Sequence, residues 1–252
     1  MKKYIAIMTL ICMLLCGCSK GDDNTGNPTF PQNTRPHPEK LTVYLLEKAD
    51  LADTGYINYQ YDGKNNVTGY TVFTLEDEEM FRGEFSDFDA NGMARSYQAH
   101  GERYTVSYYT NGKLQQMQIE DSGFSGNRWV YNDNGELTER QEYYRDELTS
   151  VERYVYENGV LVDAWGEDNA GNRLYECKIS KGLVTEIVYA DALGGETYVY
   201  EYDENGNMIA ADMVVEGETV PVARYSYRAV EVDYDRGCCL LEQQSFLRLV
   251  TT

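Results

Sequence analysis

Residues 197–209 read TYVYEYDENGNMI and contain the clearest indication of the fold in the sequence. Tyr198, Tyr200 and Tyr202 occupy every second position, so their side chains share one face of a strand. Asn205-Gly206 follows, and this dipeptide is typical of a tight turn between antiparallel strands. The stretch therefore predicts a strand, a turn and the start of a second strand that pairs with the first.

The same arrangement recurs along the chain. Glycines 112, 135, 159, 182 and 206 follow one another in steps of 23, 24, 23 and 24 residues, with a second turn signal between each pair. A fixed period is the signature of a repeat architecture, here two strands and two turns per repeat. We therefore predict an all-β fold: an elongated antiparallel β-meander of repeated hairpins, as a single-layer or partly rolled sheet. A closed barrel is the alternative that the sequence leaves open.

The repeat domain is expected to cover residues 41–252. At its start, Leu41–Leu51 fits either a strand or a short helix, and we favour a strand that extends to about Leu46. The aromatic content supports a sheet, because 23 of the 252 residues are tyrosine. Aromatic pairs across strands contribute about 0.5–1.5 kcal/mol beyond burial, and the hydroxyl group tolerates water at the margin of a half-dry face.

The first 17 residues are typical of a lipoprotein signal peptide. Lys2 and Lys3 precede an apolar segment that is too short to span a bilayer comfortably. Residues 15–18, Leu-Cys-Gly-Cys, resemble the bacterial lipobox, and this resemblance implies cleavage before Cys18 and lipidation of that residue. The alternatives are an ordinary secretory peptide and a short membrane anchor.

Residues 18–40 are predicted to be a tether between the lipid anchor and the folded domain, because four of the five prolines lie there. The acidic Asp22-Asp23 shortly after Cys18 resembles the surface-export signal of Bacteroidota-type lipoproteins. We therefore expect an outer-membrane lipoprotein that is exposed on the cell surface.

The charge of the chain limits its partners. Forty-two acidic residues against 22 basic ones give a net charge of −20, which argues against binding to nucleic acid because the phosphates would be repelled. Loss of the first 17 residues removes two lysines and leaves −22. The same repulsion from anionic lipid means that membrane attachment depends on the acyl chains on Cys18.

Residues 200–209, YEYDENGNMI, resemble the YD repeat of Rhs-type proteins, whose pattern is Y-x-Y-D-x-x-G-x-L. Looser copies are YQYDG at 59–63, WVYNDNGEL at 129–137 and YVYENGVL at 154–161, and most copies outside 59–63 lack the aspartate. The pattern is also similar to that of β-meander lipoproteins of gut Bacteroidota. The resemblance covers about residues 56–240. The sequence departs from Rhs-type proteins in having no large array and no toxin-like domain after Tyr234, so we expect about a dozen strands that form a ribbon or a half-turn of a shell.

The binding hypothesis concerns the aromatic face of this sheet. Exposed aromatic rings with polar edges can stack on sugar rings or contact an envelope protein. The candidate ligand-binding residues are Trp129, Tyr131, Tyr154, Tyr156, Trp165, Tyr198, Tyr200 and Tyr202. The competing interpretation is that these rings pack against neighbouring strands. We expect a non-enzymatic binding or adhesion module; the alternatives are a polysaccharide hydrolase with an Asp/Glu pair and a purely structural envelope component.

Signals for catalysis, metals and cofactors are weak. No nucleophile elbow, phosphate-binding loop or HExxH motif is present, and His100 beside the Gly101 turn is expected on the surface. Asp203 to Asn207 offers oxygen atoms for Ca²⁺, but turn formation explains the same residues, so no metal or cofactor is expected.

The mature chain would keep three cysteines besides Cys18. Cys177 could form a disulfide with Cys238 or Cys239, and the latter two are expected at a strand end.

Overall fold

The computed structural model describes residues 38–109, 111–119 and 123–251. The predicted signal peptide (1–17), Cys18 and the tether up to residue 37 lie outside the described residues. Within the described ranges the chain forms sixteen strands, a short 3₁₀ helix at Asp191–Leu193 and one α-helix, α1 (Tyr234–Thr251). The strands are β1 (Lys40–Leu51), β2 (Gly55–Tyr61), β3 (Val67–Phe73), β4 (Glu79–Phe88), β5 (Ala94–Ala99), β6 (Glu102–Tyr108), β7 (Leu114–Ile119), β8 (Gly126–Tyr131), β9 (Leu137–Tyr144), β10 (Glu147–Glu157), β11 (Val160–Asp168), β12 (Arg173–Ser180), β13 (Leu183–Tyr189), β14 (Thr197–Tyr202), β15 (Met208–Val215) and β16 (Glu218–Asp233).

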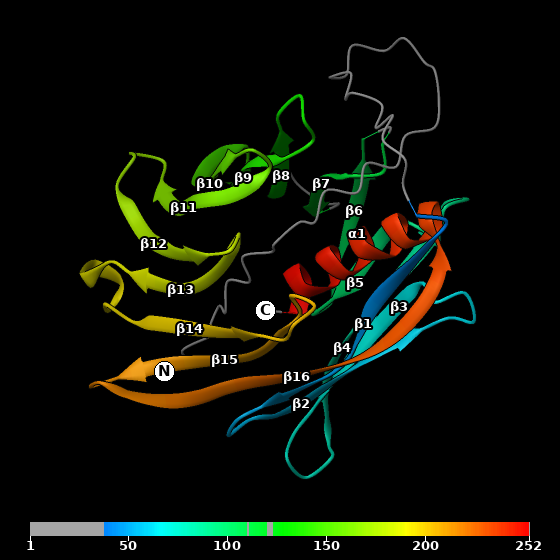
Figure 1. The fold of residues 1–252 in the computed structure, drawn as a ribbon, viewed down its shortest axis with the longest axis horizontal. Helices are drawn as coiled ribbons and strands as arrows, with labels where there is room; N and C mark the ends of the chain where they lie inside the picture. Colours follow the sequence, from blue (N-terminus) through cyan, green and yellow to red (C-terminus); the bar gives the residue numbers. More distant parts are fainter. Residues whose placement is uncertain (1–37, 110, 120–122, 252) are drawn as a thin grey trace.

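The strands form one closed barrel (Figure 1). Each strand pairs with its neighbours in the sequence, and β1 pairs antiparallel with β16 from Lys40↔Asp233 to Leu51↔Ala223. The predicted all-β antiparallel meander is thus confirmed, whereas the open or partly rolled sheet is wrong. Closure has a physical reason: it pairs both terminal strands and leaves no exposed sheet edge to aggregate. Residues 41–51 form a strand, as predicted, but the strand extends to Leu51 and not to Leu46.

The predicted turns lie between the strands. Glycines 112, 135, 159, 182 and 206 all have positive φ, which glycine adopts without strain. At Asn158-Gly159 both turn residues have positive φ, as the Asn-Gly dipeptide predicts. At Asn205-Gly206 the glycine alone does, and the loop is longer.

Three of the longer loops have the same hydrogen-bonding pattern, which Asp203 illustrates. Its Oδ1 accepts the backbone N–H groups of Asn205 and Asn207, both at 2.9 Å, and its Oδ2 accepts the Asn207 side chain. Asp62 and Asp168 make the corresponding bonds in their own loops. The aspartate of the YD pattern is therefore a turn-forming residue.

One face of each strand lines the barrel interior, and tyrosine fills much of it. The interior core includes Tyr70, Tyr97, Tyr154, Tyr175 and Tyr200, all buried. The Tyr70 and Tyr97 hydroxyl groups hydrogen-bond to each other at 2.6 Å. The aromatic excess thus fills the space inside a single sheet that has closed on itself.

The C-terminal helix α1 turns back into the ring of strands after β16 (Figure 1). Leu240 packs with Val43 and Leu45 of β1, and Phe246 packs on Phe85 and Tyr97 from β4 and β5. The sequence predicted hairpins up to residue 252, with Cys238 and Cys239 at a strand end; both predictions are wrong, because both cysteines lie on α1. Cys177 is a free thiol, so it pairs with neither.

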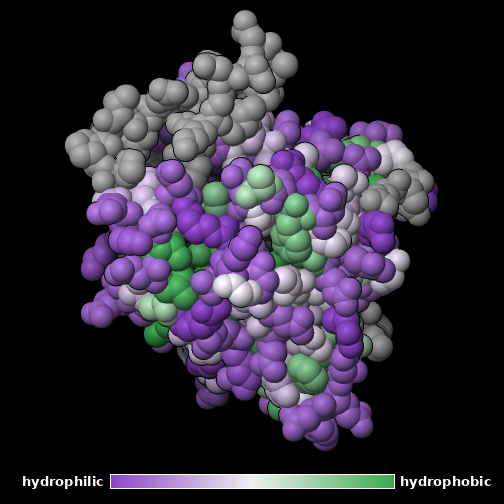
Figure 2. All heavy atoms as spheres, turned by 90° about the vertical axis from the view of Figure 1, so that its right-hand side faces the viewer, coloured by the Kyte–Doolittle hydropathy of each residue, from purple (hydrophilic) through white to green (hydrophobic). Residues whose placement is uncertain are grey.

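The two ends of the barrel differ. We call the end that carries the 62–66, 89–93 and 203–207 loops the helix end, because Arg236 of α1 donates to the backbone oxygens of Lys64 and Asn91 there. The opposite end carries the loops at 52–54, 74–78 and 216–217. The chain enters at the helix end, where Tyr234 N–H donates to Glu39. The face shown in Figure 2 is mostly hydrophilic, with small separate apolar areas.

Candidate functional site

Five of the eight predicted binding residues lie inside the barrel. These side chains are at most 7% exposed: Trp129, Tyr131, Tyr154, Tyr198 and Tyr200. The prediction that they share a face is confirmed, but an exposed aromatic face is wrong for these five. Closure of the ring makes the shared face an interior one, where the rings pack against each other.

Two further candidates, Tyr156 and Tyr202, are half-buried against the same core. The Tyr202 hydroxyl donates to the backbone oxygen of Val184 at 2.7 Å, which fixes the ring. These contacts support the sheet itself, so neither residue offers a free stacking surface.

Trp165 differs from the other seven because it lies on the outer wall. Its neighbours on β11, Ala164 and Gly166, are buried, and a Cβ on Gly166 would collide with the ring of Tyr175 inside the barrel. Strand alternation therefore directs Trp165 outwards. The indole is half-buried among charged side chains.

We call these side chains the Trp165 cluster: Glu139, Arg153, Trp165, Glu167 and Arg173. The indole Nε1–H donates to Glu167 at 3.1 Å, and the Arg173 guanidinium lies 4.2 Å from the centre of a Trp165 ring. Arg153 donates to Glu167 at 2.6 Å and to Glu139 at 2.5 Å. The register brings them together, since Arg153 of β10 is opposite both Glu139 of β9 and Trp165 of β11.

The hydrogen bonds of the Trp165 cluster set the charge of Glu167. The bond from Arg153, followed by the one from Trp165, lowers the pKa of Glu167 below its usual value. Glu167 therefore stays ionised at neutral pH and holds the indole in place. An aromatic ring flanked by fixed planar donors and acceptors can stack on an apolar face and hydrogen-bond to hydroxyl groups at its margin.

A second cluster of polar side chains lies inside the barrel, around Glu152. Its two oxygens accept hydrogen bonds from Arg140 and from the Tyr154 hydroxyl, both at 2.6 Å. Burial is the main cause that raises the pKa of the nearby Cys177 thiol to about 12, so this thiol stays protonated. The hydrogen bonds from Arg140 and Tyr154 satisfy both oxygens of the buried Glu152 side chain, and the bond from Arg140 joins β9 to β10.

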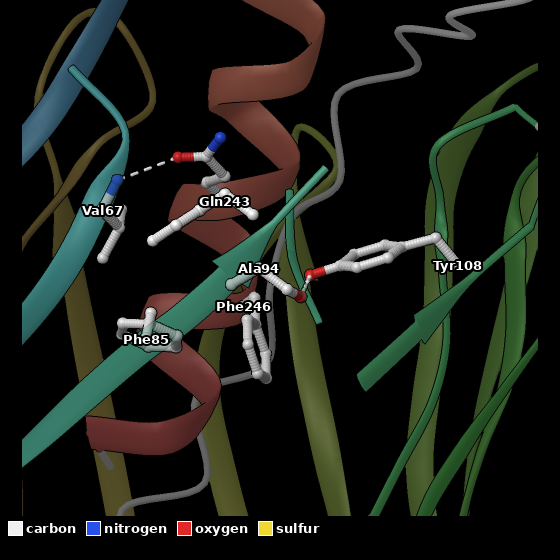
Figure 3. Close-up of a pocket in the computed structure, with 7 residues that line it drawn as sticks. Val67, Phe85, Ala94, Tyr108, Gln243 and Phe246 are labelled. Carbon is white, nitrogen blue, oxygen red and sulfur yellow. Dashed lines mark hydrogen bonds between the residues drawn. The ribbon is translucent and has the colours of Figure 1, made fainter. Parts of the chain in front are cut away.

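Helix α1 is held against the barrel by buried polar side chains that were not predicted from the sequence. Gln243 Oε1 accepts the backbone N–H of Val67 (Figure 3). Its Nε2 donates to Gly92, and Gln244 Oε1 accepts the N–H of Leu46. Glu242 and Lys113 form a buried ion pair at 3.5 Å. Burial is the largest influence on the pKa of Glu242 and raises it, although Lys113 opposes the shift. No local pattern pointed to these contacts, because their partners are distant in sequence.

The remaining expectations concern His100 and metals. His100 is exposed beside its turn, as predicted, and stacks near Phe81. Over residues 38–109, 111–119 and 123–251, no group of three His, Cys, Asp or Glu side chains is arranged to hold a metal ion. In these same ranges, no helix has the length and apolar character needed to cross a bilayer.

The fold and site define the class of structure: a closed antiparallel barrel with an internal C-terminal helix and an outward-facing tryptophan cluster. No protein-family model matches the sequence, and no curated protein does so either. Among solved structures, the chain is similar to a porin-like protein from Bacteroides uniformis ATCC 8492, with 14% identity and a TM-score of 0.46 over 75% of this chain and 96% of that one.

A second similarity is to a TcdB2-TccC3-Cdc42 structure, with 15% identity and a TM-score of 0.34. It covers 73% of this chain and 11% of that one. A TcdB2-TccC3 structure without its hypervariable C-terminal region matches with 14% identity and a TM-score of 0.34, over the same shares of the two chains.

Proposed function

We propose that the protein is a surface-anchored, non-enzymatic binding module that contacts a neutral glycan through the Trp165 cluster. The observation that supports this most directly is the outward position of Trp165, in contrast to the buried Trp129. The lipid anchor expected on Cys18 would hold the barrel at the outer membrane and present its wall to the surroundings.

The chemistry of the Trp165 cluster fits a sugar ring better than a charged ligand. Arg153 is paired with two carboxylates, and Arg173, which lies over the indole, pairs with Glu176 at 3.9 Å, so the positive charges are already compensated. A neutral ligand avoids the cost of breaking these pairs. Hydroxyl groups can instead share the lone pairs of Glu139 and Glu167 while the C–H face of the sugar contacts the indole.

The test uses the full-length chain in detergent on an array of neutral and acidic glycans. We expect binding to one neutral class, and Trp165→Ala to weaken it by about tenfold or more, which corresponds to a loss of about 1.4 kcal/mol. The matched control is Tyr144→Ala, which removes another exposed aromatic ring, at the end of β9 and outside the Trp165 cluster. An equal loss in both variants, or no bound glycan on the array, contradicts the proposal.

A further inference from the structure

A second surface lies at the opposite end of the barrel, on the outside. It is a hollow of about 220 Å³, lined by residues of β1, β2, β16 and the loops after β1 and β3. Its lining combines small residues, Ala52 and Gly55, with the larger Tyr56, Leu75 and Pro221. The buried Ala223 also lines the hollow.

The Tyr56 wall is held in a fixed position. Its ring stacks on Phe73 with 5.1 Å between centroids, and its hydroxyl donates to Asp77 at 2.8 Å. Lys48 lies 4.6 Å from the centre of the same ring. A rigid aromatic wall loses little conformational entropy when a ligand binds, which is typical of residues that dominate interface energetics.

Leu75 gives the hollow an exposed apolar lip. Its side chain is 64% exposed, the largest exposed fraction among the exposed large hydrophobic residues of the described chain. The residue projects from the 74–78 loop next to the Tyr56 wall. An exposed apolar residue at the mouth of an apolar hollow marks a surface that gains from contact with another apolar side chain.

The surroundings of the hollow are acidic. The charges at its edge are compensated, since Lys48 pairs with Asp50 and Arg224 with Asp212, both at 2.5 Å. The exposed carboxylates of the two flanking loops, Asp53, Glu76, Asp77 and Glu78, form no ion pair with a described lysine or arginine. The negative charges of these two loops are therefore uncompensated, in a chain whose net charge is −20.

We propose that this hollow docks a basic segment of a partner protein, which inserts one apolar side chain between Tyr56 and Pro221. The apolar lining accommodates the anchoring side chain, and the loop carboxylates attract lysine and arginine residues on either side of it. The site lies at the end of the barrel remote from the point where the tether joins the folded domain. It is separate from the Trp165 cluster and does not depend on glycan binding.

The test measures fluorescence anisotropy of labelled nine-residue peptides with the full-length chain. One peptide carries lysine and arginine at both ends and a central leucine; a second has a central alanine, and a third replaces the basic residues by glutamate. We expect the leucine peptide to bind at least tenfold more tightly than the alanine peptide, and the glutamate peptide not to bind. The affinity should also fall as salt is added.

Ala52→Trp fills the hollow from an exposed loop position and should abolish the preference for leucine over alanine. Leu75→Asp should do the same without filling the space, and thermal melting checks that both variants fold. Val162→Trp, at an exposed position on β11, is the matched control and should keep the preference. Glu76→Gln combined with Glu78→Gln should weaken the binding of both basic peptides equally.

Equal binding of the leucine and alanine peptides, or an unchanged preference in both Ala52→Trp and Leu75→Asp, overturns the proposal. Loss of glycan binding in Trp165→Ala has no bearing on it.

Discussion

At the residue scale, several of the longer loops begin with an aspartate that accepts the hydrogen bonds of its own turn. Asp203 accepts three hydrogen bonds inside its own loop and so satisfies donors that the strands cannot pair. Where an asparagine starts the loop, as Asn132 does, its oxygen accepts the same two backbone N–H groups. Replacement of aspartate by asparagine at this position therefore preserves the acceptor oxygen.

We expect Asp203→Ala to reduce the free energy of unfolding by about 1.5–3 kcal/mol, because hydrogen bonds to a charged acceptor are lost together. Urea denaturation measures the change. Asp133→Ala is the control, since Asp133 lies exposed in an equivalent loop in which Asn132 supplies the accepting oxygen; it should stay within about 0.5 kcal/mol of the parent protein. A similar loss in both variants would contradict the role assigned to Asp203.

The same variant should also alter the acid sensitivity. Burial by itself would raise the pKa of Asp203, but the hydrogen bonds from Asn207 and Asn205 outweigh it and lower the pKa below 3.8. The carboxylate therefore stabilises the fold above about pH 3.8, and this contribution is lost as the pH falls through the lower pKa of the folded state. The difference in stability between parent and Asp203→Ala should accordingly shrink below about pH 4.

At the element scale, α1 shows where sequence patterns lose their predictive power. A surface helix has an apolar stripe and a polar face, but α1 is enclosed, and Gln243 and Gln244 are as buried as Leu240. Its glutamines bind strand backbone groups, which no helical periodicity reveals. The strands, by contrast, could be predicted because alternation and turn residues are local properties.

We expect Phe246→Ala to destabilise the protein by about 3–5 kcal/mol, because it leaves a cavity between α1 and the inner faces of β4 and β5. Near-ultraviolet circular dichroism should report loosened tyrosine packing, and urea denaturation should give the free energy. Leu193→Ala, whose side chain is 51% exposed, is the control and should have little effect. A barrel that kept its full stability with Phe246→Ala would show that α1 is not part of the core.

At the scale of the whole molecule, closure of the barrel determines which face of the sheet is enclosed and which is exposed to solvent. The alternation of Tyr198 and Tyr200 predicted a shared face correctly, but whether that face is open or enclosed depends on the pairing of β1 with β16. The ion pair of Lys40 with Asp233 joins residues 193 positions apart, and no local pattern encodes it. For the same reason the candidate site could be predicted at Trp165 alone, while the hollow beside Tyr56 needed the folded barrel.

The charge of the whole molecule bears on how it is held at a membrane. With a net charge near −20 the barrel is repelled by anionic lipid headgroups, so attachment is expected to depend on the acyl chains of Cys18. We therefore expect Cys18→Ala to move the protein from the membrane fraction to the soluble fraction, with an unchanged circular dichroism spectrum because the barrel begins only at Lys40. Cys177→Ala is the matched control, since it removes a cysteine within the barrel and should leave the protein in the membrane fraction. Membrane retention of Cys18→Ala after a high-salt wash would mean that another part of the chain binds the bilayer.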